Sequence, residues 1–232
     1  MNTVVSVMAL PVFRELSPEA ASEFGSALVL RRMRRGEIIF GEHDPADGIY
    51  FVLSGKVKLC RGHGNPTAPD NRHSLLRLLG PASIFGELSA LDGGRRSSSA
   101  TAVTAVELAR LPQDALRELM ARHPSLTAAF IHQLVDRLRR ADLVITGLSL
   151  NDVPGRVAAM LLHLADAVGE PRPEGILVAH ELTQSELAAM VGATRETVNR
   201  TLTDLASRGI IDNGFRRLTI RDLARLRQRI LR

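Results

Sequence analysis

The sequence predicts an α+β protein with a small N-terminal β-barrel or jelly roll, a long helix and a C-terminal winged helix-turn-helix. Short alternating segments separated by glycines occupy residues 37–111, a pattern typical of a small closed β structure. A regular apolar repeat covers residues 134–148, as in a helix that pairs with another helix. Two short helical patterns then flank Gly192 and precede a hairpin signal. We therefore expect three parts: residues 1–123, 124–150 and 151–232.

The N-terminal part begins with an expected amphipathic helix that follows the cap Ser17-Pro18-Glu19 and carries Ala20, Phe24 and Leu28. After Arg31 the pattern changes to strands separated by turns. Strands are expected at residues 37–40, 48–53, 56–60 and 74–79, and two more within 100–111. Ser54-Gly55 predicts a tight turn, and the glycines and prolines of residues 61–73 predict a long hairpin tip.

A helix is expected to open at Pro112-Gln113-Asp114-Ala115, and a longer one after Pro124. The apolar residues of the longer helix follow 4-3-4-3 spacing: Leu134, Leu138, Ala141, Ile145 and Leu148. This spacing is that of a two-stranded coiled-coil seam. Such a seam packs either on the chain's own barrel or on a second copy of the helix. Its length and the arginines beside it favour a homodimer; these are Arg137, Arg139 and Arg140.

The second half of the chain opens with Asn151-Asp152-Val153-Pro154, which interrupts the long helix and starts another, since proline fits a first helical turn. We interpret this junction as a domain boundary and hinge. A helix over residues 156–168 and a Pro/Gly loop over 169–175 are expected to follow.

The helix-turn-helix prediction depends on caps and on one glycine. Thr183 and Glu186 have the spacing of a capping box, and Gly192 stands where a sharp turn needs a left-handed residue. Thr194 caps the second helix, whose inward residues are Val198 and Leu202. Its outward residues are Arg195, Glu196, Asn199 and Arg200. Asp212-Asn213-Gly214 then predicts the hairpin of a wing.

The outward residues of this second helix suit the major groove of double-stranded DNA. Arg195 and Arg200 carry the donors that read guanine, and Glu196 can accept from cytosine. The alternative is a solvated helix with an ion pair between Glu196 and Arg200. Three hydroxyl side chains are expected to bond phosphates: Thr183, Thr194 and Thr197. The basic surplus lies nearby, since residues 205–232 hold eight Arg against two acidic residues.

A second candidate site lies between two barrel strands. Backbone N–H groups near Gly86 and Glu87, the Ser97 hydroxyl and the Arg96 guanidinium together form a plausible cradle for one phosphate. Glu87 would accept a hydrogen bond from a sugar hydroxyl. The alternative is an ordinary turn and an exposed Arg-Ser loop.

The order of these elements resembles the cyclic-AMP receptor protein/FNR family of bacterial transcription regulators, over essentially the whole chain. The segments that carry the resemblance are Phe85–Leu88 with Arg96-Ser97, Asp152–Arg156, and Val191–Arg200. The hinge segment has the form found in actinobacterial members. By resemblance, the expected ligand contacts are Gly86, Glu87, Leu88, Arg96 and Ser97, and the base-reading residues are Arg195, Glu196 and Arg200.

The resemblance implies a cyclic-nucleotide-binding sensor domain at residues 1–123, a dimerisation helix at 124–150 and a DNA-binding domain at 151–232. It also implies cAMP as ligand, TGTGA-like half-sites, and RNA polymerase as a partner. One departure concerns the base of the ligand. Where cAMP-responsive members present hydroxyl groups to adenine, this chain has Ala141 and Asp142, whereas Arg137 is retained. The ligand is therefore cAMP bound differently, cGMP, or none, and the last case describes a constitutive DNA-binding regulator with a vestigial pocket.

Other classes of protein fit the sequence less well. Cys60 is the only cysteine, which argues against an iron–sulfur sensor, and a haem sensor would need His43, His63 or His73, which are expected in loops. An enzyme using Glu87 with one of these histidines lacks a nucleophile or metal motif, so we expect neither catalysis nor a metal. Without a secretion signal or an apolar run near the roughly 18–20 residues that span a bilayer, we expect a cytoplasmic protein without membrane contact.

Overall fold

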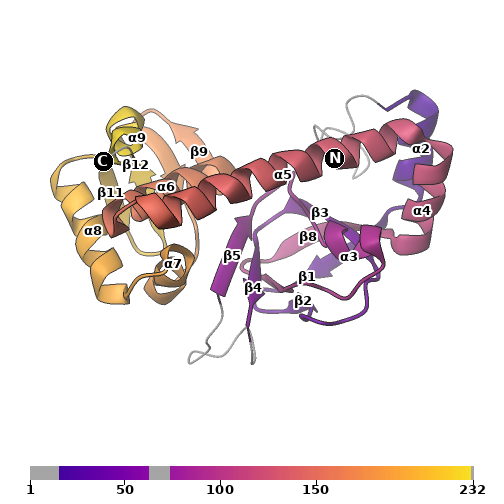
Figure 1. The fold of residues 1–232 in the computed structure, drawn as a ribbon, viewed down its shortest axis with the longest axis horizontal. Helices are drawn as coiled ribbons and strands as arrows, with labels where there is room; N and C mark the ends of the chain where they lie inside the picture. The colour runs from indigo at the N-terminus through magenta and orange to yellow at the C-terminus, as the bar shows by residue number, and fades with distance from the viewer. Residues whose placement is uncertain (1–15, 63–73, 231–232) are drawn as a thin grey trace. The chain divides into compact units, whose positions relative to one another are not determined.

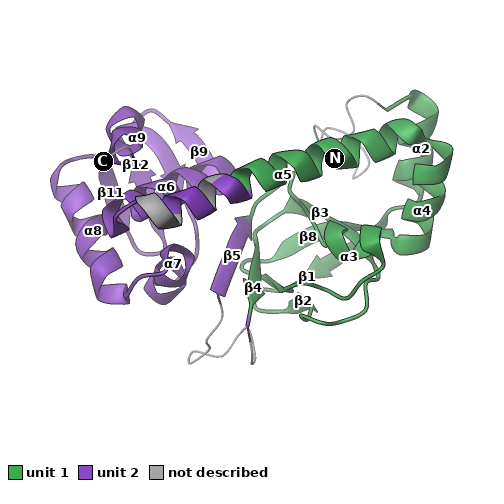
Figure 2. Ribbon diagram, viewed as in Figure 1, with its two compact units in different colours: residues 1–61, 79–140 green, residues 62–78, 141–232 purple. Residues whose placement is uncertain are grey.

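The computed structural model describes residues 16–62 and 74–230 (Figure 1). The chain divides into two compact units (Figure 2). The first unit comprises residues 1–61 and 79–140, and the second comprises residues 62–78 and 141–232. Each unit is described by itself. The hairpin tip expected at residues 61–73 falls largely outside the described residues, as do His63 and His73.

The first unit begins with helix α2 (Pro18–Ser26), as the cap predicted. The Ser17 hydroxyl accepts a hydrogen bond from the backbone N–H of Ala20 at 3.3 Å, and Phe24 is fully buried. The helix ends before Leu28, which was expected to belong to it. Strand β1 (Val29–Met33) begins at the next residue, Val29, before the change of pattern predicted at Arg31. The strand forms because it pairs with a later strand, β8.

The first unit contains two antiparallel layers. One sheet has the order β1-β8-β3-β6, and the other contains β2, β7 and β4 in that order. Their bounds are β2 (Ile38–Phe40), β3 (Gly48–Ser54), β4 (Val57–Arg61), β6 (Ile84–Phe85), β7 (Ser99–Ala102) and β8 (Val106–Pro112). A further strand, β5 (Ser74–Leu79), lies where the sequence predicted it. The strands confirm the predicted jelly-roll class.

Side-chain alternation in β3 builds two cores from one strand. Tyr50 and Val52 point into the space between the two sheets and pack with residues of both layers. Ile49 and Phe51 point to the opposite face, where helices cover the sheet. These helices are α2, α4 (Gln113–Arg122) and the start of α5 (Pro124–Leu150), as Figure 1 shows. The predicted long helix is therefore present, and its first turns belong to the core of the first unit.

The junction between α5 and α6 (Val153–Val168) forms as the sequence predicted. The Asp152 carboxylate accepts from the backbone N–H of Gly155 at 2.8 Å, and Pro154 occupies the first turn. The next segment differs from the prediction. Residues expected as a loop form β9 (Gly169–Arg172), which pairs with β10 (Gly175–Val178). Pro171 is tolerated because β9 is the edge strand of its sheet.

The winged helix-turn-helix follows, with α7 (Gln184–Val191), α8 (Arg195–Ser207), β11 (Ile211–Gly214) and β12 (Arg217–Ile220). The wing hairpin is confirmed, but its turn lies later than expected. Asp212-Asn213-Gly214 belongs to β11, and the turn is formed by Phe215 and Arg216, whose φ is +54°. A last helix, α9 (Leu223–Ile230), was not predicted, because it has one fully buried apolar residue, Leu226, among arginines. It packs against α6.

Candidate functional site

The first candidate site begins at Gly86, between β6 and the short helix α3 (Glu87–Asp92); the sequence did not predict this helix. Gly86 has a φ of +75°, and a Cβ there would lie 2.6 Å from Nη1 of Arg96. A side chain is therefore excluded by backbone conformation and by space. Gly86 lets the chain turn so that Glu87 enters the unit while Leu88 remains exposed.

Arg96 is the most buried charged residue among those described, with 1% of its surface exposed. Its Nη1 donates to the carbonyl of Gly86 at 2.7 Å and to the Ser89 hydroxyl at 3.0 Å. Its Nη2 donates to Asp47 at 2.6 Å and to the carbonyl of Gly48 at 2.8 Å. The guanidinium carbon lies 4.1 Å from the centre of the Phe40 ring. Arg96 thus ties the cassette to β3, and only its buried Nε has no hydrogen-bond partner in the described chain.

Asp47 supplies the negative charge that this buried cation needs. Its carboxylate also receives hydrogen bonds from the Tyr50 hydroxyl at 2.7 Å and from Arg110 at 3.0 Å. Burial alone would raise the pKa of Asp47, but the hydrogen bonds from Tyr50 and Arg96 and the charges of Arg96 and Arg110 lower it below its ordinary value. Burial and the neighbouring Asp47 raise the pKa of Tyr50 to about 12.

The sequence did not point to Asp47, Tyr50 or Arg110. Asp47 is 49 residues from Arg96 in the sequence, and none of the three belongs to a recognisable motif. The available signal was the chemistry of Arg96 itself, because a cation between two barrel strands requires a buried acceptor.

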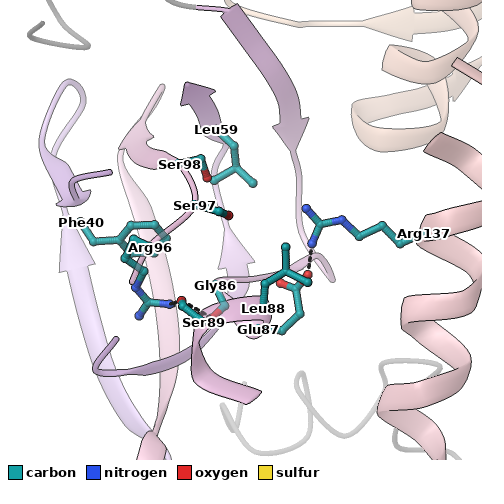
Figure 3. Close-up of a pocket in the computed structure, with 10 residues that line it drawn as sticks. All are labelled: Phe40, Leu59, Gly86, Glu87, Leu88, Ser89, Arg96, Ser97, Ser98 and Arg137. Carbon is teal, nitrogen blue, oxygen red and sulfur yellow. Dashed lines mark hydrogen bonds and ion pairs between the residues drawn. The ribbon is translucent and has the colours of Figure 1, made fainter. Parts of the chain in front are cut away.

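Glu87 is also buried, with 2% of its surface exposed. Its Oε1 is bonded to Nη1 of Arg137, which reaches it from α5 (Figure 3). Its Oε2 is buried and has no hydrogen-bond partner within the described residues. A carboxylate oxygen in that position costs about 1–3 kcal/mol unless a donor reaches it. The site therefore offers an acceptor that a ligand hydroxyl can satisfy.

These residues line a small open pocket, drawn in Figure 3. Arg96 and Ser89 lie on one side of Gly86, and the pair of Glu87 and Arg137 lies on the other. The lining is formed by Phe40, Leu59, Gly86, Glu87, Leu88, Ser89, Arg96, Ser97, Ser98 and Arg137. It thus contains every expected ligand contact except Asp142, which is exposed on α5.

The second candidate site is the outer face of α7 and α8. The capping box is present: the Thr183 hydroxyl accepts from the N–H of Glu186 at 3.2 Å, and the Glu186 carboxylate accepts from the N–H of Thr183 at 2.7 Å. Gly192 has a φ of +60°, as the predicted turn requires. Thr194 caps α8 by accepting from the N–H of Thr197 at 3.2 Å.

Helix α8 separates its apolar and polar residues as the sequence predicted. Val198 and Leu202 are fully buried, so the opposite side of the helix faces outward. The exposed residues there are Arg195, Glu196, Asn199 and Arg200. Of the three expected phosphate contacts, Thr183 and Thr194 are exposed and Thr197 is half-buried. All seven residues therefore lie on or beside the two helices that the motif requires.

Glu196 does not form the ion pair with Arg200 that was the alternative interpretation of this helix; in the described part of the chain no such pair occurs. The pKa of Glu196 is lowered by hydrogen bonding with its own backbone N–H and with Thr194, together with the charge of Arg195. Arg200 is therefore exposed on α8 and is not held by an ion pair with Glu196.

A metal site and a haem-binding histidine are the other kinds of site to consider within residues 16–62 and 74–230. No group of three or more His, Cys, Asp or Glu side chains in these residues is arranged to hold a metal ion. His43 is exposed in a turn, where its φ is +70°. None of the described helices has both the length and the apolar character needed to cross a membrane.

Two known domain families match this chain, one in each half. The cyclic nucleotide-binding domain family matches residues 30–123, and the Crp-like helix-turn-helix domain family matches residues 155–229. The chain is 41% identical over 218 residues to a CRP-like cAMP-activated global transcriptional regulator of Mycobacterium tuberculosis, covering 94% of this chain and 95% of that protein.

Two solved structures, from Thermus and Bradyrhizobium, are similar to this chain. The chain is 36% identical to the crystal structure of the Thermus thermophilus catabolite activator protein, with a TM-score of 0.53 over 95% of this chain and 98% of the other. FixK2 from Bradyrhizobium japonicum has a TM-score of 0.75 over 87% of this chain and 96% of its own, at 23% identity, which supports the fold alone.

Proposed function

Because the chain belongs to the CRP/FNR family of DNA-binding transcription regulators, we propose that it is a homodimer whose binding to DNA is controlled by a cyclic nucleotide. Members of this family are transcription regulators and not enzymes. We assign ligand sensing to residues 1–123, subunit pairing to residues 124–150 and DNA binding to residues 151–232. RNA polymerase is the partner that a regulator of transcription would act on.

The observation that carries the ligand proposal is the buried Glu87 carboxylate with an unpaired Oε2 in the pocket. A ribose hydroxyl is the donor that this oxygen lacks. The phosphate of the same ligand would meet the exposed Ser97 hydroxyl, the backbone near Gly86 and the charge of Arg96. Because both terminal amino groups of Arg96 are already bonded, Arg96 has to share or give up a contact when the phosphate binds.

Cyclic AMP is the first candidate, because relatives at 41% and 36% identity are named for it. The expected environment of the base differs from that of cAMP-responsive members, which present hydroxyl groups to adenine. Arg137 is at the pocket, but Ala141 offers no hydrogen bond and Asp142 only accepts. Asp142 suits the exocyclic amine of adenine and the amines of guanine, so cGMP is the second candidate. A constitutive regulator with a vestigial pocket is the competing proposal, favoured by the same loss of hydroxyl groups.

The dimer proposal rests on an apolar stripe along α5. Ile131, Leu138 and Ile145 are spaced by seven residues and are 54%, 64% and 61% exposed in the single chain. Such a stripe supports pairing with a second copy and argues against burial on the chain's own barrel. The side chains of residues 148–150 lie outside the described part of the structure. Two copies would bring two α8 helices to palindromic DNA with TGTGA-like half-sites about one helical turn apart.

Calorimetric titration with cAMP and cGMP tests the ligand proposal. We expect the wild-type chain to bind at least one nucleotide saturably. The affinity of Glu87→Gln for that nucleotide should be lower by about tenfold or more, because a hydrogen bond to a charged acceptor is lost. Glu42→Gln is the matched control: Glu42 is a largely buried barrel glutamate that pairs with Arg61 at 3.3 Å and is absent from the pocket lining. Absence of heat with both nucleotides, or unchanged affinity in Glu87→Gln, would contradict the proposal.

A further inference from the structure

Arg156 connects two segments of the second unit that are far apart in the sequence. It lies in the first turns of α6, and its Nη1 donates to the carbonyl of Asn151 at 3.1 Å. Its Nε donates to the carbonyl of Val191 at 2.9 Å, and its Nη2 lies 3.5 Å from the carbonyl of Gly192. Val191 is the last residue of α7, and Gly192 is the turn that leads to α8.

The carbonyl contacts of Arg156 use groups that helices leave unsatisfied. The last carbonyls of a helix have no partner within it and carry partial negative charge. The planar guanidinium holds several acceptors in a fixed arrangement, which a flexible ammonium cannot do. Arg156 therefore holds the turn between α7 and α8 at a defined position beside the first turn of α6.

The third acceptor links this turn to the end of α5. The backbone N–H of Asn151 donates to the carbonyl of Gly147 at 2.9 Å, which continues the hydrogen bonding of α5. The carbonyl of the same residue is held by Arg156. Asn151 therefore joins the two elements: its N–H is hydrogen-bonded to α5, and its carbonyl accepts from Arg156. Helix α8 begins at Arg195, three residues after the turn at Gly192.

The same junction is held from its other side by α9. Arg229 pairs with Asp152 at 2.9 Å, and Asp152 caps α6 through the N–H of Gly155. This second contact fixes the start of α6 but does not reach α7 or α8. Helix α6 also packs against α7 and α8, and among the described residues it is Arg156 whose hydrogen bonds join the end of α5 to the turn before α8.

We infer that Arg156 is a positioning residue that sets the direction of α8 relative to the end of α5, and thereby the half-site spacing that two copies accept on DNA. This inference rests on the proposed function, since it needs paired half-sites. In this role Arg156 does not contact a DNA base. Its loss leaves α8 able to read one half-site but lets the two reading helices vary in separation.

A spacing series tests the inference. Affinity is measured on duplexes whose two half-sites are separated by the preferred spacing or by one or two base pairs more or fewer, and on a duplex with a single half-site. The wild-type chain is expected to prefer one spacing by about tenfold or more, and Arg156→Gln to reduce that preference to about twofold. On the single half-site, Arg156→Gln should bind within about threefold of wild type.

Arg225→Gln is the matched control. Nη1 of Arg225 donates to the carbonyl of Arg208 at 3.1 Å, where Arg208 caps the other end of α8. This variant removes an arginine–carbonyl contact of the same kind without touching the α5–α6 junction, so its spacing preference should match wild type. Circular dichroism and thermal melting establish that each variant is folded. Should Arg156→Gln fail to fold, Arg156→Lys keeps one contact and should show an intermediate preference.

The outcomes separate this inference from the proposed function. Equal losses of affinity at every spacing in the Arg156 variants would overturn the positioning role, because they would reflect destabilisation alone. A wild-type chain that binds its preferred half-site but shows no spacing preference would overturn the proposed paired reading itself, and the inference with it.

Discussion

Leu138→Glu is expected to yield a folded monomer that binds paired half-sites no better than a single half-site. Leu138 is 64% exposed in the single chain, so the substitution costs the isolated fold little. In a paired helix the same position faces the partner, where two glutamates would be desolvated and would repel each other. Loss of the second reading helix removes avidity, and affinity for paired sites should fall about a hundredfold or more.

Sedimentation and DNA titration of the same samples measure this effect. His132→Glu is the matched control, because His132 is exposed on α5 but lies outside the stripe of Ile131, Leu138 and Ile145. It adds a similar charge and should leave the dimer intact. If Leu138→Glu sediments as a dimer, or binds paired sites as wild type does, the α5 stripe is not the dimer interface.

Arg195→Ala is expected to abolish sequence preference while leaving weak, salt-sensitive binding to any duplex. Arg195 is exposed at the first position of α8, where its guanidinium can make two hydrogen bonds to one guanine. Such a contact discriminates by about 1–3 kcal/mol, so two half-sites should lose roughly 2–6 kcal/mol together. Binding through phosphates remains because it does not depend on sequence.

Competition titrations with specific and random duplexes, each at two salt concentrations, give the preference directly. Arg208→Ala is the control of equal charge: Arg208 is exposed at the far end of α8 and pairs with Asp204 at 2.9 Å. It should weaken both duplexes alike. Equal losses on specific and random DNA in Arg195→Ala would show that α8 does not read bases through this residue.

Local signals in the sequence predicted most of the fold. Ser17, Thr183 and Thr194 all cap helices in the structure as predicted, and α6 starts at the predicted Asn151–Pro154 junction. The misses have physical causes. Strand β9 contains Pro171 and is stabilised by pairing, which local composition does not reveal. Helices α9 and α3 are only eight and six residues long, so each contains about two turns of a helical period or fewer.

The candidate sites were predictable only in part, for the same reason. The cassette motif pointed to Gly86, whose turn is a local feature, and to Glu87, whose partner Arg137 lies 50 residues further along the chain. It assigned Arg96 to a phosphate alone, whereas its terminal amino groups bind Asp47 and the cassette itself. These partners meet across 49 residues of chain, a separation that no local pattern encodes. Arg156 belongs to a recognised hinge motif, but its carbonyl contacts to the end of α7 required the fold.

The central claim is that a nucleotide in the N-terminal pocket changes how strongly the α8 helices bind DNA. Titration of one palindromic duplex in the absence and presence of saturating cAMP, and then cGMP, tests it most directly. We predict that one of the two nucleotides tightens specific binding about tenfold, and that Glu87→Gln loses this increment at the same nucleotide concentration. An affinity that is unchanged by a nucleotide that calorimetry shows to be bound would contradict the claim.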